Sequence, residues 1–207
     1  MSASRARVLE LAVLGALNEA PLHGYELRKH LNGELGAFRA FSYGSLYPCL
    51  RDLLRRGLVR EVTGDPPSGR GRRSRIVYQL TPSGKAWLER LLAEPGPATL
   101  DDACFGVHFS LFCHTSSDVR LRILEGRRKR MQERLEWLRE RVRTAAARGD
   151  DYGIELHRHG AESVEREMYW LDDLIVRERG RAGQAEMEGS ATLQARPGAP
   201  PPADRSV

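Results

Sequence analysis

The chain has 207 residues, 41% of them hydrophobic, which is enough for one medium-sized domain or two small domains with an apolar core. Residues 1–93 carry 15 Lys and Arg against 8 Asp and Glu, whereas residues 94–207 carry 18 against 20, so only the first segment suits contact with a polyanion. The sequence shows no leader and no apolar run near the roughly 20 residues of a membrane span. Its three cysteines have no paired spacing, which is typical of a reducing compartment. We therefore expect a soluble, cytoplasmic protein without membrane contact.

Helical and strand signals alternate in the first segment. Apolar residues at helical or alternating spacing predict helices over 5–18, 24–31, 42–56 and 82–93, and strands over 58–63 and 75–80. Ser42 is expected to cap the third helix and Gly57 to end it, while Thr81 and Pro82 are expected to open the fourth. This order, three helices, a hairpin and a helix, predicts a winged helix-turn-helix with a two-stranded wing in residues 1–93.

The third helix and the hairpin turn carry side chains that suit DNA. On the helix, hydroxyls and one Arg lie away from the apolar positions, and such groups contact phosphates or base edges. In the turn, four arginines fall within residues 70–75, as expected of a wing that contacts the phosphate backbone or a minor groove. For Tyr47 the sequence leaves packing in the core as an alternative. The expected DNA-binding residues are Ser42, Tyr43, Ser45, Tyr47, Arg51, Arg70, Arg72, Arg73 and Arg75.

The second half of the chain is predicted to contain a linker, a helical domain and a tail. Residues 94–101 are expected to be the linker, 102–180 a helical dimerisation domain, and 181–207, rich in Gly, Ala, Pro and Ser, a disordered tail. Within the helical domain, residues 116–147 and 152–179 each carry one narrow apolar stripe, interrupted only at Arg128, which a second copy of the chain could cover. The expected dimerisation residues are Leu121, Leu124, Met131, Leu135, Leu138, Val142, Val164, Met168, Leu171 and Ile175.

Three stretches resemble a known family. LAVLGALNEAPLHGYEL (11–27), SYGSLYPCLRDLLRRGLV (42–59) and YQLTPSG (78–84) are similar to the phenolic acid decarboxylase regulator (PadR) family of transcriptional regulators. The resemblance covers about the first 90 residues, and the helical second half is similar only in length and character to the larger subgroup of that family. It implies a homodimer that binds a near-palindromic operator, usually as a repressor, and releases it when a small-molecule effector binds.

Other chemistry finds less support in the sequence. There is no nucleophile elbow, phosphate-binding loop or recognisable catalytic triad, so we expect no enzyme and no cofactor. A metal site formed by Cys104, His108, Cys113 and His114 is conceivable, but such residues on a Phe-rich face are more often part of a core, and we predict no metal. Large aromatic residues outside the DNA-binding elements could line an effector pocket between subunits, with packing in a dimer core as the alternative for most of them: Trp87, Phe109, Trp137 and Trp170.

We therefore expect a mostly α protein with a small β-wing that binds double-stranded DNA as a sequence-specific homodimeric repressor. The alternative is a winged-helix module that docks another protein and does not bind DNA specifically. The sequence does not identify the operator, the regulated genes, the effector or the direction of regulation.

Overall fold

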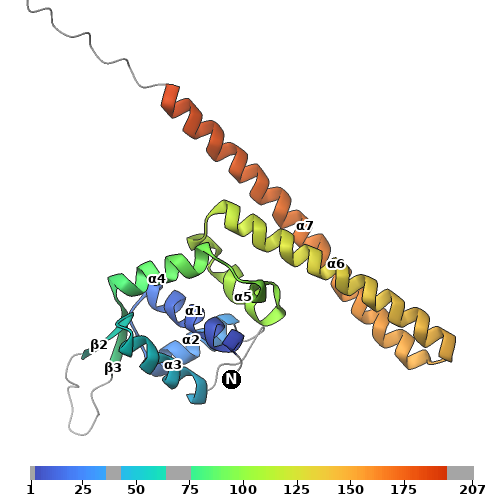
Figure 1. The fold of residues 1–207 in the computed structure, drawn as a ribbon, viewed down its shortest axis with the longest axis horizontal. Coiled ribbons are helices and arrows are strands. Elements are labelled where there is room, and N and C mark those ends of the chain that lie inside the picture. Colours follow the sequence, from blue (N-terminus) through green and yellow to red (C-terminus); the bar gives the residue numbers. More distant parts are fainter. Residues whose placement is uncertain (1–2, 36–42, 64–75, 195–207) are drawn as a thin grey trace, which may run out of the picture.

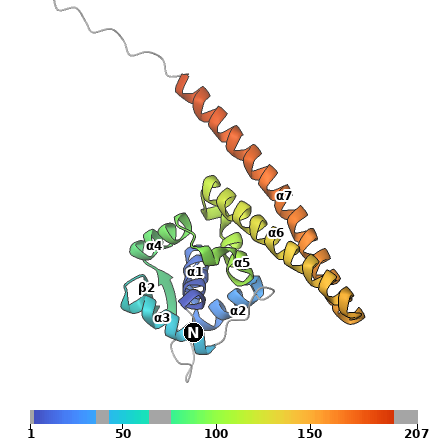
Figure 2. The same ribbon diagram turned by 45° about the vertical axis from the view of Figure 1, so that its right-hand side comes forward.

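A computed structural model describes residues 3–35, 43–63 and 76–194 (Figure 1). The chain forms a helical domain with one small sheet, from which a long helical hairpin extends (Figures 1 and 2). The elements in chain order are α1 (Ala3–Glu19), β1 (Leu22–His23), α2 (Gly24–Leu35), α3 (Tyr43–Arg55), β2 (Val59–Thr63), β3 (Ile76–Leu80), α4 (Pro82–Ala93), η1 (Pro97–Leu100), α5 (Asp102–Ser110), η2 (Phe112–His114), α6 (Ser117–Arg148) and α7 (Asp151–Gln194).

Helix α1 lies at the centre of the N-terminal domain. Its sequence is apolar on nearly every side, and Val13 and Leu14 are fully buried, as expected of a helix enclosed by others. Leucines of α2, α3 and α4 pack around it. The main members of this core are Leu9, Leu17, Leu27, Leu31, Leu46, Leu50, Leu53, Leu88 and Leu92. The predicted helices of this domain are therefore confirmed, and α1 is the element that the others share.

The sheet has three strands, not the two that we expected. Its order is β1-β3-β2, all antiparallel, with Leu22 opposite Tyr78 and Val59 opposite Leu80. The two-stranded prediction was incomplete because β1 has only two residues, too few to show alternation. β1 pairs with the edge of β3 that β2 leaves open, and so attaches the start of α2 to the hairpin.

The predicted start of α4 and the predicted end of α3 are both confirmed. Thr81 accepts a hydrogen bond from the backbone N–H of Gly84 at 3.0 Å, and Pro82 occupies the first turn. Gly57 follows α3 with φ +68°, which favours glycine. Position 84 requires a glycine because the backbone of Leu58 lies close to it: a Cβ at this position would lie 2.0 Å from the carbonyl oxygen of Leu58. These contacts fix α4 against the end of the α3–β2 connection.

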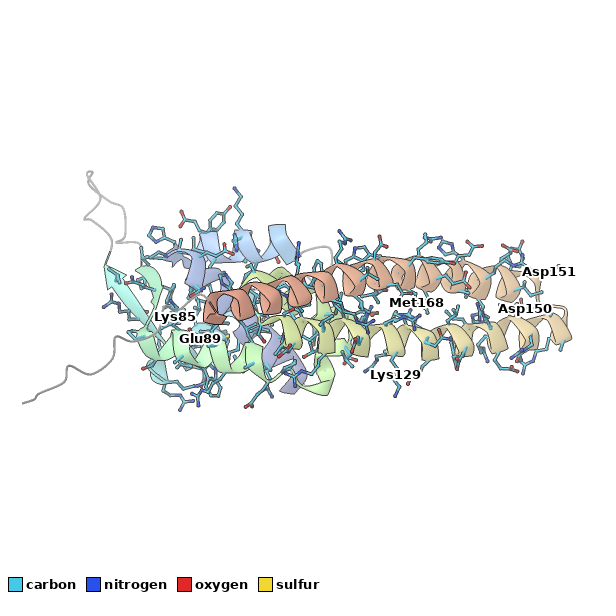
Figure 3. All side chains as sticks on the ribbon, turned by 90° about the horizontal axis from the view of Figure 1, so that it is seen from above. Lys85, Glu89, Lys129, Asp150, Asp151 and Met168 are labelled. Carbon is cyan, nitrogen blue, oxygen red and sulfur yellow. The ribbon has the colours of Figure 1, made fainter. Side chains whose placement is uncertain are left out.

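Helices α6 and α7 form an antiparallel hairpin, the arm, whose turn at Asp150 and Asp151 lies far from the N-terminal domain (Figure 3). Met168 lies between the two helices (Figure 3). The apolar stripes that we assigned to dimerisation cover each other within one chain, which corrects the sequence-based argument. Seven of those ten side chains are buried in this intramolecular seam: Leu124, Met131, Leu135, Leu138, Val164, Leu171 and Ile175.

One of the charged residues buried between α6 and α7 is Arg127, the neighbour of the Arg128 that interrupts the apolar pattern. The Arg127 side chain is 5% exposed, against 41% for Arg128. Its Nη2 lies 2.6 Å from Asp102 Oδ1 and 2.7 Å from Glu167 Oε1, and its Nη1 donates to the carbonyl oxygen of Leu100 at 2.7 Å. Arg127 thus connects α6 to α7, to η1 and to the start of α5.

Helix α5 belongs to both parts of the molecule. Cys104, Val107 and Leu111 belong to the core around α1, while Phe105 and Phe109 pack with the arm. The predicted helical domain, residues 102–180, includes α5, and in the structure α5 is a bridge between the two cores. The division of the chain at residues 94–101 stays a prediction, although η1 gives that segment a turn of 3-10 helix.

Helix α7 continues past the end that we expected. It runs to Gln194, whereas we placed the start of a disordered tail at residue 181. Residues 195–207 lie outside the described residues. Glycine is only a weak helix breaker, costing about 1 kcal/mol against alanine, so Gly180 alone does not end a helix of this length. Within the described ranges, no helix is long and apolar enough to cross a bilayer.

Candidate nucleic-acid interface

Helices α2 and α3 form the helix-turn-helix, and α3 presents two different faces. Leu46, Leu50 and Leu53 are buried against α1 and α2. The other face is exposed and carries Gly44, Tyr47, Pro48, Arg51 and Arg55. Both views show α3 and the β2–β3 hairpin on the side of the domain away from the arm (Figures 1 and 2). A long polyanion can therefore approach this face without meeting α6 or α7.

Tyr47 is half-exposed at the first turns of α3. Its side chain is 40% exposed and is not part of the core. Its hydroxyl lies near the start of α2, since a Cβ added to Gly24 would meet that oxygen at 3.0 Å. The sequence left DNA contact and core packing open as roles for Tyr47. In the structure the ring packs against the start of α2, and part of the side chain remains exposed to solvent.

Ser45 lies on a different side of α3 from Tyr47 and Arg51. It is half-buried and lines a small hollow with Leu9 and Glu10 of α1. Ser45 is therefore not part of the exposed face with which we grouped it, and its predicted DNA contact stays a prediction. Ser42 lies outside the described residues, and of Tyr43 only the backbone is described, so their predicted contacts remain predictions.

The exposed arginines of α3 differ in their partners. Arg51 makes no ion pair or hydrogen bond with any other described residue. Arg55 binds Asp52 one turn back, and Arg56 reaches the same carboxylate at 3.2 Å. Hydrogen bonds from Arg55 and Arg56 lower the pKa of Asp52, which therefore stays ionised and neutralises part of the charge beside it. Arg51 is left as the cation of this face available to an external anion.

The wing arginines fall outside the described residues. Arg70, Arg72, Arg73 and Arg75 all lie in the segment 64–75 that connects β2 to β3. The structure does place both ends of that segment, since Thr63 pairs with Ile76 at the last register position of the hairpin. The predicted wing contacts are therefore neither supported nor opposed by the geometry.

Sequence reasoning missed two arginines near this face. Arg55 follows Arg51 by one helical turn and continues the exposed stripe, a signal that the periodicity already contained. Arg60 on β2 donates from Nη2 to Gln79 Oε1 on β3 at 2.7 Å. That contact depends on the strand register, which the sequence did not specify.

The four aromatic residues expected to line an effector pocket do not come together. Phe109 and Trp170 are neighbours, with ring centroids 5.2 Å apart. Trp87 is elsewhere, in the N-terminal domain, where its indole N–H donates to Glu10 Oε1 at 2.7 Å and Arg90 lies over its ring. Trp137, 58% exposed, contacts His157 near the far end of the arm. The four residues are therefore not gathered within one chain, and their shared pocket stays a prediction.

The conceivable metal ligands are also divided. Cys104 and His108 are buried on α5, whereas Cys113 is exposed on η2. In the part of the chain that the structure describes, no group of three or more His, Cys, Asp or Glu side chains is placed to hold a metal ion. Burial raises the pKa of the Cys49 thiol on α3 to about 12, so this cysteine is an unreactive thiol at neutral pH.

Comparison with known proteins finds relatives of the N-terminal domain. Residues 13–90 match the model of the Transcriptional regulator PadR-like family. The Negative transcriptional regulator PadR of Bacillus subtilis is 33% identical over 98 residues, which are 46% of this chain and 52% of that protein. The chain is also similar to a crystal structure of Bacillus subtilis PadR in complex with operator DNA. The superposition covers 83% of this chain and 98% of the PadR chain, with 23% sequence identity and a TM-score of 0.40. A second PadR crystal structure, which holds p-coumaric acid, is similar at 23% identity and a TM-score of 0.38.

The domain is thus a winged helix-turn-helix with an exposed second helix, carried on a helical arm. Its sequence adds a likeness to a family: residues 13–90 of the chain are similar to the Transcriptional regulator PadR-like family. The matched part spans about half the length of the curated relatives, 52% of one and 43% of another.

Proposed function

We propose that the protein is a sequence-specific DNA-binding transcriptional regulator. The observation that carries this proposal is the exposed face of α3, with Tyr47, Arg51 and Arg55, on a PadR-like domain. A guanidinium without an internal partner can bind guanine or phosphate, and a phenol edge can contact a base or a phosphate oxygen. The net charge of residues 1–93 adds a long-range attraction to DNA.

The direction of regulation and the assembly belong to the same proposal. We propose repression because the relative in Bacillus subtilis is named a negative regulator. We propose a homodimer because the arm exposes large apolar side chains after its own seam is closed. The most exposed are Tyr152, Tyr169, Val176, Leu156 and Trp137, between 58% and 91%. A dimer presents two recognition helices to a near-palindromic operator, with a small-molecule effector releasing it. The site of action is the cytoplasm.

The decisive experiment compares α3 with the wing. DNA fragments that the purified full-length protein retains from its own genome supply the operator. Arg51→Ala is expected to cost roughly 1–3 kcal/mol on that operator and less on random DNA, because a base contact is lost. Arg72→Ala with Arg73→Ala is expected to weaken both, and to flatten the slope of log affinity against log salt by up to about two charges.

Matched controls separate contact from folding. Arg139→Ala, on the arm, removes another exposed arginine and is expected to leave DNA binding unchanged. Tyr47→Phe keeps the ring against Gly24 and deletes the hydroxyl, so lost operator affinity assigns that hydroxyl to DNA. If the parent retains no fragment above random DNA, the protein-docking alternative is favoured. A dimer is expected in sedimentation at micromolar concentration, and a monomer there contradicts the proposed assembly.

A further inference from the structure

The segment that joins the N-terminal domain to the arm consists of α5 with a short 3-10 helix on each side, η1 before it and η2 after it. One face of α5 packs into the core around α1 and the other against the arm, so this segment sets how the domain sits on the arm. On the arm side, Phe105 and Phe109 contact Trp170 with ring centroids 6.2 and 5.2 Å away. Apolar packing is not directional, so these contacts hold α5 against the arm but do not by themselves fix its orientation.

Arg120 on α6 holds the end of this segment. Its Nη1 donates to the carbonyl oxygens of Phe112 at 3.0 Å and Thr115 at 2.9 Å. Its Nε donates to Glu178 Oε2 on α7 at 2.8 Å, and the Glu178 side chain is only 7% exposed. The last carbonyl groups of a helix have no partner within it, and an arginine side chain can supply one. Arg120 therefore binds the end of η2 and α7 at the same time.

Arg127 holds the beginning of the segment in the same way. Its Nη1 donates to the carbonyl oxygen of Leu100, the last residue of η1, and its Nε donates to Glu167 Oε1 on α7, both at 2.7 Å. Its Nη2 lies 2.6 Å from Asp102 Oδ1 at the start of α5. Arg120 and Arg127 are seven residues apart, about two turns, so they lie on one face of α6 and hold α5 from both ends. A planar guanidinium donates in set directions, so each arginine constrains the angle between α7 and the backbone beside α5.

Other arginines of α6 lack one of these features. Arg128 pairs with a carboxylate of α7, but among the described residues it donates to no backbone carbonyl. Arg130 and Arg134 reach carboxylates near the start of α5, but both ion pairs consist of side chains that are at least 45% exposed. Solvent screens such pairs, so they constrain the segment weakly.

We propose that Arg120 with Glu178, and Arg127 with Glu167, are positioning residues that hold the N-terminal domain in one orientation on the arm and so determine which spacing of operator half-sites the dimer accepts. The proposal rests on the proposed function, because it concerns an operator with two half-sites. One inserted base pair moves a half-site by about 3.4 Å and rotates it by about 34° around the DNA axis. A domain held in one orientation cannot follow this change, whereas a loosely held domain can.

A distance within one chain tests the attachment without DNA. Lys85 on α4 and Lys129 on α6 are exposed and lie on the two regions to be compared (Figure 3). Spin labels are placed by Lys85→Cys and Lys129→Cys in the full-length chain, with Cys113→Ser because Cys113 is exposed. Labelled chains are mixed with a large excess of unlabelled chains, so that double electron–electron resonance measures distances within one chain. The chain with native arginines is expected to give one narrow distance distribution.

Two double variants, Arg120→Met with Glu178→Met and Arg127→Met with Glu167→Met, remove one attachment each. Methionines keep the seam between α6 and α7 packed and leave no buried charge without its partner, so a loss of Tm of no more than about 8 °C is expected. The distance distribution is expected to become at least about twice as wide.

Arg128→Met with Asp172→Met is the matched control, because it removes a pair across the same two helices and no bond to a carbonyl. It is expected to keep the narrow distribution. Arg120→Lys keeps the charge but not the planar group with several donors, and is expected to give an intermediate width. If a double variant does not fold, Arg120→Lys still tests the attachment.

Operator spacing is measured separately, on the operator that the parent retains and on versions with one or two base pairs inserted between its half-sites. The parent is expected to lose at least about tenfold in affinity on insertion, and the double variants no more than about threefold. Affinity for an isolated half-site is expected to be the same for all of them, since α3 and the wing are unchanged.

The possible failures can be told apart. A distribution as narrow in the double variants and in Arg120→Lys as in the parent overturns the attachment. Equal widening by the Arg128 control overturns the assignment to these two arginines. A wider distribution with the parent's spacing preference overturns the role in specificity alone. Absence of operator binding by the parent overturns the proposed function, while the distance measurement still decides the attachment.

Discussion

The N-terminal domain and the arm both contain many arginines, but they use them in opposite ways. On the arm, α6 and α7 are joined by ion pairs between arginines and carboxylates: Arg120–Glu178, Arg127–Glu167, Arg128–Asp172, Arg139–Glu165 and Arg179–Glu125. On the exposed face of α3 in the N-terminal domain, Arg51 has no such partner among the described residues. The arm thus neutralises its arginines internally, while the domain keeps some of its positive charge for an external anion.

This difference explains the uneven charge of the sequence. Carboxylates outnumber basic residues slightly in residues 94–207 because the two helices of the arm need partners for their arginines. The apolar seam between α6 and α7 is narrow, so the register of the two helices depends also on which charges meet. The N-terminal domain has a broad leucine core, and its ion pairs, such as Arg56–Glu10 and Arg55–Asp52, leave Arg51 without a partner among the described residues.

The largest expected effect of breaking this arrangement is at Arg127. Arg127→Ala is expected to lower the free energy of unfolding by about 3 kcal/mol, because the carbonyl oxygen of Leu100 and two carboxylates lose a buried partner. The value lies at the low end for a buried pair, since the side chains of Asp102 and Glu167 are 67% and 30% exposed. Urea unfolding at one fixed protein concentration measures it.

Arg128→Ala is the neighbouring control. Its side chain is 41% exposed and that of Asp172 is 46% exposed, so its loss is expected to cost under about 1 kcal/mol. Arg127→Met keeps an apolar stem in the seam and is expected to recover part of the loss. Equal destabilisation by Arg127→Ala and Arg128→Ala contradicts the assignment of Arg127 as the buried residue.

The next largest effect is the dependence of the free energy of unfolding on acid pH, which we expect from His108 on α5, between the N-terminal domain and the arm. Burial, with a smaller effect of the Arg7 charge, lowers the pKa of His108 to about 4 in the folded chain, against 6.5 for an ordinary histidine. The unfolded chain therefore takes up the proton first as pH falls. Stability from this group is complete above pH 6.5, decreases as pH falls toward 4 and then levels off. The loss is at most about 3 kcal/mol.

Unfolding between pH 7 and 4 is compared for the parent and for His108→Asn. The variant is expected to show a smaller slope in this window, since it cannot take up the proton. His159→Asn, which changes an exposed histidine of the arm, serves as the control and is expected to retain the slope of the parent. Parallel slopes for the parent and His108→Asn indicate that His108 titrates normally in the folded chain.

The smallest effect is expected at the surface pairs of the arm. Arg139 and Glu165 are 57% and 41% exposed, and their Nη2–Oε1 distance is 2.9 Å. Arg139→Ala is expected to change the free energy of unfolding by about 0.5 kcal/mol or less, because solvent screens such a pair. A double-mutant cycle with Glu165→Ala measures the pair alone. If the coupling free energy of Arg139 and Glu165 equals the loss of stability caused by Arg127→Ala, exposed pairs stabilise the arm as much as the buried Arg127 does, which contradicts this prediction.

Local signals in the sequence determined most of the secondary structure. Helix periodicity, the Thr81–Pro82 start and the glycine at 57 act within a few residues, and each gave the correct element. The exposed face of α3 followed from the same periodicity, which is why Tyr47 and Arg51 were found. Ser45 was grouped with the exposed residues because a hydroxyl suits both a groove and a half-buried side, and only the position of α1 shows that this side chain is half-buried.

Contacts between distant segments were decided only by the tertiary structure. β1 becomes a strand because β3 has a free edge beside it, and two residues carry no pattern of their own. Arg127 and Arg128 are adjacent, about 100° apart around the helix, so the partner helix alone selects the one that is buried. The bonds of Arg120 and Arg127 to backbone carbonyls need η1, η2 and the arm to meet, and packing over such separations leaves no trace in residue spacing. Periodicity shows which side of a helix is apolar, and the fold decides what that side contacts.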